Sequence, residues 1–161
     1  MTEIRFYHLQ RARLEDVLPV ILERCHQRGD RALVLAGSEE RVEALAAHLW
    51  TYRPESFLPH GSLRDGNPAD QPIFLATAPD ASLPPGDAGG NPNQAPVLVL
   101  TDGARHGGIA GFRLVCEFFD GHDETAVAQA REQWRSYRAA GHAVVYFQQS
   151  DSGKWQETAR A

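Results

Sequence analysis

Three arginines recur along one predicted helix at a spacing that suits carboxylate binding. At about 100° per residue, Arg131, Arg135 and Arg138 fall within an arc of roughly 60°. Trp134 and Tyr137 follow on the neighbouring side of the helix, so an apolar face borders the arginines. A guanidinium group pairs with a carboxylate through two parallel hydrogen bonds, and an aromatic ring edge adds an apolar anchor point. The pattern therefore suits an acidic peptide with an apolar anchor.

A purely structural interpretation fits the same spacing. An amphipathic helix commonly carries solvated arginines on one side and core-facing aromatic residues on the other, and spacing alone favours this interpretation. The charge distribution argues the other way. Residues 131–141 hold three arginines against Glu132, whereas the whole chain carries a net charge of −5. The arginine stripe is a positive patch on an acidic chain, and both interpretations stay open at this point.

The sequence contains none of the common catalytic or metal-binding motifs. It lacks the glycine-rich phosphate loops, the histidine and cysteine spacings of metal sites and the nucleophile elbow. We therefore expect no catalytic residue, no metal and no cofactor. Four glycines, Gly103, Gly107, Gly108 and Gly111, could cradle an anion, although a flexible connection explains them more simply. A nucleotide-binding enzyme on a Rossmann-like fold remains the alternative hypothesis.

Length and charge restrict the class of protein. A chain of 161 residues with 42% hydrophobic residues is large enough for one domain with its own core. The net charge of −5 argues against general nucleic-acid binding. Direct binding of single-stranded DNA by the arginine and tryptophan face is a further alternative, which this charge disfavours. No apolar run approaches the ~20 residues of a membrane span. We expect a cytoplasmic protein without membrane contact.

The order of predicted elements indicates an α/β fold. Strands are predicted at 4–9, 31–36, 73–77, 97–100, 113–119 and 142–148, and helices at about 15–25, at 38–50 and at 124–140. Asp123 is the expected cap of the last helix, and Gly141 its stop signal. This order predicts a single-domain, Rossmann-like three-layer fold with mostly parallel strands. The domain is expected at 1–149, with a Pro- and Gly-rich surface loop at 79–96 and a C-terminal tail at 150–161.

Several segments together resemble the chi subunit of bacterial DNA polymerase III, an accessory subunit of the clamp-loader assembly. They are residues 6–9 (FYHL), 49–50 (LW), 55–60 (ESFLPH), 118–121 (FFDG) and 130–142 (AREQWRSYRAAGH). The ESFLPH and AREQWRSYRAAGH blocks are each fairly specific, and the resemblance covers nearly the whole chain.

This resemblance implies a non-catalytic adaptor in DNA replication. Members of the family bind the acidic C-terminal tail of the single-stranded DNA-binding protein, which ends in a Phe with a free carboxylate. They also join the clamp loader through a psi subunit. The resemblance therefore implies that any association with DNA is indirect.

The resemblance also assigns the site residue by residue. Arg131 and Arg135 are expected to pair with carboxylates of the tail, and Trp134 to line its pocket, with Tyr137 and Arg138 beside it. Trp50 matches an aromatic position of the family, so we expect it to pack or to contribute to the pocket on the same face of the molecule.

Overall fold

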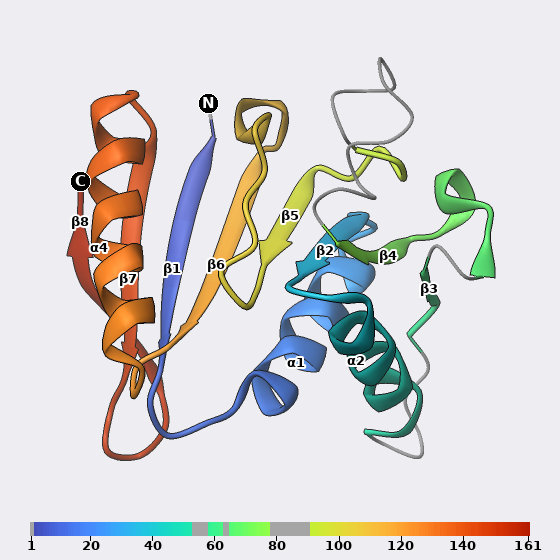
Figure 1. Ribbon diagram of the computed structural model, residues 1–161, viewed down its shortest axis with the longest axis horizontal. Coiled ribbons are helices and arrows are strands. Elements are labelled where there is room, and N and C mark those ends of the chain that lie inside the picture. Colours follow the sequence, from blue (N-terminus) through green and yellow to red (C-terminus); the bar gives the residue numbers. More distant parts are fainter. Residues whose placement is uncertain (1, 53–57, 63–64, 78–90) are drawn as a thin grey trace.

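The computed structural model describes residues 2–52, 58–62, 65–77 and 91–161. In these residues one sheet holds eight strands in the order β3-β4-β2-β5-β6-β1-β7-β8 (Figure 1). The strands are β1 (Glu3–Leu9), β2 (Ala32–Ala36), β3 (His60–Ser62), β4 (Ile73–Thr77), β5 (Val97–Leu100), β6 (Leu114–Asp120), β7 (Ala143–Gln149) and β8 (Trp155–Arg160). Neighbouring strands run parallel except for β7 and β8, which are antiparallel. The predicted α/β, Rossmann-like fold is confirmed.

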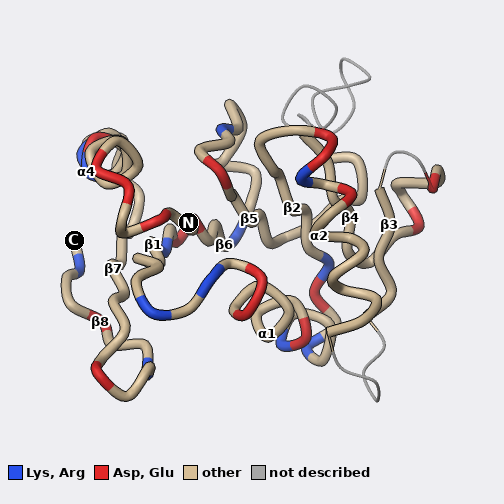
Figure 2. The backbone as a smooth tube through the Cα atoms, turned by 60° about the horizontal axis from the view of Figure 1, so that its bottom comes forward, with Lys and Arg blue, Asp and Glu red and all other residues tan. Residues whose placement is uncertain are grey.

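Helices cover both faces of the sheet. The helices α1 (Leu14–Gln27) and α2 (Glu39–Thr51) pack on one face, and α4 (Glu124–Ala139) packs on the other (Figure 2). The side chains of β1 contribute to the cores on both faces of the sheet. Tyr7 and Leu9 belong to the core under α1 and α2, whereas Ile4 and Phe6 belong to the core under α4. The strands read as continuous apolar runs because both of their faces are buried.

Capping residues set the ends of α4 where the sequence predicts them. The Asp123 side chain accepts hydrogen bonds from the backbone N–H groups of Thr125 and Ala126. Gly141 follows the helix with a φ of 91°, a left-handed conformation that glycine adopts without steric cost. The helix α1 begins at Leu14, within one residue of the predicted start, and Pro19 is buried in its second turn. No helix in the described part of the chain has the length and apolar character of a membrane span.

The C-terminal segment differs from the expectation of a tail over 150–161. Residues Trp155–Arg160 form β8, which pairs with β7, and the Trp155 ring packs edge-on against Tyr7 at 5.2 Å between centroids. The expectation of a tail was therefore wrong. The sequence did not reveal the strand because five of the six β8 residues are exposed, and such an edge strand lacks the alternation of apolar and polar residues by which strands are recognised.

The predicted surface loop at 79–96 lies partly outside the described residues, which resume at 91. The end of this segment is anchored to the sheet. Asn93 is fully buried, and its side-chain amide donates hydrogen bonds to the carbonyl oxygens of Ala32 at 2.9 Å and Gln71 at 3.1 Å. The chain thus enters β5 from a fixed point between β2 and the segment before β4.

A close backbone approach joins the end of β6 to β1. The Gly121 N–H donates to the Leu9 carbonyl at 2.7 Å. A Cβ atom at position 121 would lie 2.1 Å from the imidazole ring of His8. Glycine is therefore required here by space, and this contact fixes where the chain turns into α4.

The substitution Gly121→Ala tests this close approach. We expect the added methyl to displace the His8 ring and to lower the free energy of unfolding by about 1–3 kcal/mol. Urea denaturation followed by circular dichroism measures the change. Gly107→Ala is the matched control, because no atom lies within 4 Å of a Cβ at that position. Equal stability of the two variants would contradict the steric account.

Candidate functional site

The predicted arginine stripe lies on the surface of α4. Arg131, Arg135 and Arg138 are all exposed. Arg135 makes a long ion pair of 3.5 Å with Glu132, itself exposed, and such surface pairs contribute little. In the described part of the chain, no carboxylate lies within ion-pair distance of Arg131 or Arg138. The guanidinium groups are thus available to an anionic partner.

The two aromatic residues of the predicted site have different positions. Trp134 is partly buried, and its ring contacts Phe6 at 6.0 Å and Tyr146 at 6.1 Å between centroids. It therefore borders the arginine stripe with part of its surface exposed. Tyr137 is only 8% exposed and packs on Phe6 in the core. The structure thus removes Tyr137 from the candidate surface and assigns it to holding α4 on the sheet.

A buried polar contact under α4 was missed by sequence reasoning. Glu117 of β6 is 4% exposed; one carboxylate oxygen accepts from Arg105 at 2.7 Å, and the other accepts from the Tyr137 hydroxyl at 3.4 Å. Burial raises the pKa of the Glu117 carboxyl above its usual range, while the Arg105 charge and the two hydrogen bonds act in the opposite direction. The feature of the sequence that could have revealed this contact is Glu117 itself, a single charged residue within the apolar stretch LVCEFF.

Trp50 lies away from the other predicted site residues. It lies in the last turn of α2, on the opposite face of the sheet from α4, so it does not share the face of the other predicted site residues. Its side chain is 54% exposed, and its ring contacts that of His60 at 4.4 Å between centroids. His60 is buried, with its ring nitrogens at 2.6 Å from the Leu58 carbonyl oxygen and 2.9 Å from that of Ala46. Residues 55–57 of the ESFLPH block lie outside the described residues.

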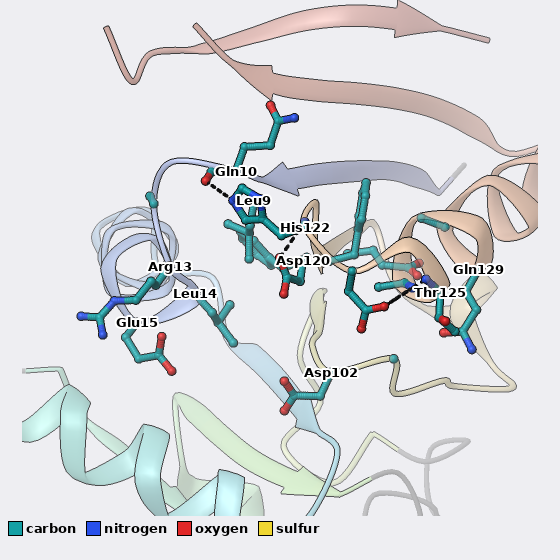
Figure 3. Close-up of a pocket in the computed structure, with 18 of the residues that line it drawn as sticks. Leu9, Gln10, Arg13, Leu14, Glu15, Asp102, Asp120, His122, Thr125 and Gln129 are labelled. Carbon is teal, nitrogen blue, oxygen red and sulfur yellow. Dashed lines mark hydrogen bonds between the residues drawn. The ribbon is translucent and has the colours of Figure 1, made fainter. Parts of the chain in front are cut away.

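A cavity of about 620 Å³ opens at the carboxyl ends of β1, β5 and β6 (Figure 3). Ligands of doubly wound folds bind at such an edge, so this cavity is where the nucleotide alternative would place its ligand. Its lining carries five carboxylates, from Glu15, Asp102, Glu117, Asp120 and Asp123. Its four arginines, Arg11, Arg13, Arg41 and Arg105, each make an ion pair with a carboxylate.

These charges do not favour a phosphate group in the cavity. Of the glycines that could cradle an anion, Gly103 lines the cavity, whereas Gly107, Gly108 and Gly111 do not. Asp102, beside Gly103, already accepts hydrogen bonds from Arg41 and from the Gly37 N–H. Within the described residues, no three His, Cys, Asp or Glu side chains gather to hold a metal ion. The arginines on α4 are less engaged than those that line the cavity.

The buried carboxyl of Glu117 predicts a pH-dependent stability. Its pKa is raised in the folded state above the unfolded value of about 4.3, so the folded state binds this proton more tightly. Protonation of Glu117 therefore stabilises the folded state. This contribution is fully present below the unfolded pKa and is lost as the pH rises through the folded pKa. The free energy of unfolding of the wild type, minus that of Glu117→Gln, should therefore increase as the pH falls from 7 to 4.5. Urea titrations at several pH values measure it, and a constant or decreasing difference would contradict the assignment.

Comparisons with known proteins agree with the resemblance of the sequence motifs. Residues 1–145 match the family described as DNA polymerase III chi subunit, HolC. A protein of Rickettsia prowazekii (strain Madrid E), named probable DNA polymerase III subunit chi, is 31% identical over 100 residues. That match covers 62% of this chain and 54% of the relative, so the chain spans about half the length of the curated relative that it matches. Because the family match extends over most of the chain, this protein belongs to the DNA polymerase III chi subunit family.

Proposed function

We propose that this chain is a non-catalytic adaptor that binds the acidic C-terminal tail of the single-stranded DNA-binding protein. In this proposal it also joins the clamp loader through a psi subunit, so that the polymerase holoenzyme is tethered to coated template. The observation that carries the proposal is the exposed stripe of Arg131, Arg135 and Arg138 beside the partly exposed ring of Trp134.

The chemistry of this surface matches an acidic tail with an apolar end. Guanidinium groups bind carboxylates with directional, charge-assisted hydrogen bonds, and the partly exposed indole offers an apolar contact next to them. The sheet core holds the Trp134 ring in place through Phe6, so little side-chain entropy is lost when a peptide binds. Attraction between a cationic stripe and an acidic tail also speeds encounter and weakens with added salt.

Direct binding of single-stranded DNA is the less favoured alternative. A phosphate-tracking protein needs a basic groove several nucleotides long, whereas this chain has a net charge of −5, and the stripe on α4 holds only three of its 16 Lys and Arg residues. Contact with DNA through the bound protein requires no such groove, and we therefore propose that the association is indirect.

The substitutions Arg131→Ala and Arg135→Ala test the proposal. Each removes a guanidinium group that pairs with the tail, so each should weaken binding of an acidic peptide about fivefold, corresponding to about 1 kcal/mol. Each should also make the affinity less dependent on salt, while the free energy of unfolding changes by less than about 0.5 kcal/mol. Fluorescence anisotropy with a labelled peptide ending in Phe measures the affinity.

Arg24→Ala is the matched control. Arg24 is exposed on α1, on the other face of the sheet, and its loss changes the net charge by the same amount. The control should bind the peptide like the wild type. If all three variants bound equally well, the site would not lie on α4.

A further inference from the structure

The strand β8 leaves one edge of the sheet unpaired. It ends the strand order and lies at the margin of the molecule in both overall views (Figures 1 and 2), and among the described residues no strand pairs with its outer side. It also lies beyond residues 1–145, the stretch that matches the chi family. A free strand edge presents backbone N–H and C=O groups to which a further strand can bond.

The register with β7 determines which backbone groups of β8 point outward. Ala161 and Val144 exchange both of their backbone hydrogen bonds, at 2.8 and 3.0 Å, so Ala161 directs its N–H and C=O toward β7. In an antiparallel pair the next residue along the strand directs these groups the other way. The N–H and C=O of Arg160, which lies opposite Val145, therefore point to the free edge.

A β-bulge adds a second outward-facing residue three positions earlier. Thr158 has no partner in the register with β7, so it is the extra residue of the bulge. Before the bulge, the Lys154 carbonyl accepts from the Ser150 N–H at 2.7 Å and thus faces β7. By the same alternation Glu157 faces outward. Glu157 and Arg160 therefore both present backbone groups to the free edge, whereas a regular strand presents residues that are two positions apart.

The side chains of these two residues carry opposite charges on the same face of the sheet. Glu157 lies opposite Phe147, and Arg160 lies opposite Val145, so both side chains are on the face that α1 covers. They form an ion pair of 2.7 Å, in which the Glu157 side chain is 42% and the Arg160 side chain 61% exposed. Both charges are thus accessible to a partner strand.

A second β8 strand satisfies both the backbone spacing and the charges. In antiparallel pairing about a two-fold axis between Thr158 and Ala159, each Glu157 lies opposite Arg160 of the second copy. The two residues can then exchange backbone hydrogen bonds, and the axis repeats this pair. The three-residue spacing is matched because the second copy has the same bulge. Registers that place Glu157 opposite Glu157, or Arg160 opposite Arg160, set like charges against each other and are unfavourable.

We propose that this chain forms a two-fold dimer in which the β8 strands of two copies pair edge to edge, with Glu157 and Arg160 setting the register. The axis is perpendicular to the sheet, so both α4 helices lie on the same face of the joined sheet. A single pair of edge strands buries less surface than a standard interface, and we therefore expect a Kd on the order of 100 μM. The dimer does not depend on which ligand α4 binds.

Two charge reversals that complement each other test the register. Sedimentation velocity of the wild type, from about 10 μM to about 1 mM at low salt, should show a dimer fraction that rises with concentration and falls with added salt. Glu157→Arg and Arg160→Glu should each weaken dimerisation at least tenfold, because like charges then face each other across the axis. An equimolar mixture of the two variants should dimerise within about threefold of the wild type, because opposite charges face each other again.

Arg24→Glu is the matched control. Arg24 is exposed on α1, and its reversal changes the net charge by the same amount as Arg160→Glu. The control should dimerise like the wild type. Thermal melts check the folding of each variant. In the wild type, hydrogen exchange of the Glu157 and Arg160 amides should slow as the protein concentration rises, whereas exchange of the Trp155 amide, outside the paired stretch, should stay the same.

Two results would overturn the dimer. One is a wild type that sediments as a monomer over the whole concentration range. The other is a wild type that dimerises while both charge reversals dimerise equally well, because the interface would then lie elsewhere. Neither result bears on the adaptor proposal, since peptide binding to α4 is measured separately.

Discussion

The fixed attachment of α4 to the sheet is the constraint on which the candidate site depends. Tyr137 packs on Phe6 and donates to the buried carboxylate of Glu117, which Arg105 holds from the loop after β5. These contacts set the rotation of the helix, and the same rotation turns Arg131 and its neighbours toward solvent. This ion pair is buried on the Glu117 side and partly exposed on the Arg105 side; it adds little net stability but is costly to break, so it favours one orientation of the helix.

Periodicity predicted the layers of the fold because the strands are buried on both faces and the helices on one. Periodicity could not show that Tyr137 is buried while Trp134 is partly exposed, because it places both residues near the side of α4 that faces the sheet. Which of the two side chains the sheet covers depends on how the helix packs. Periodicity also missed β8, where polar residues form an edge strand. The face of Trp50 depends on which side of the sheet α2 crosses, and this relation is not written in local sequence.

The distribution of charge explains why the adaptor proposal fits this member of the chi family better than a nucleotide-binding function. At the carboxyl edge of the sheet, arginines and carboxylates neutralise each other in pairs, so a phosphate would have to displace an existing partner. On α4 the arginines face solvent beside a ring that the core holds in place. In the adaptor proposal, an anionic peptide would bind this surface without displacing an existing partner of Arg131 or Arg138.

The most direct test of the adaptor proposal is the affinity of the wild-type protein for one acidic peptide ending in Phe, compared with the same peptide amidated at its C-terminus. Fluorescence anisotropy at low salt, repeated at higher salt, provides the comparison. The proposal predicts saturable binding of the free acid that weakens as salt is added, and binding of the amide at least tenfold weaker, because the terminal carboxylate has lost its charge. Equal binding of the two peptides, or no binding of either, would contradict the claim that the α4 surface recognises an acidic C-terminal tail.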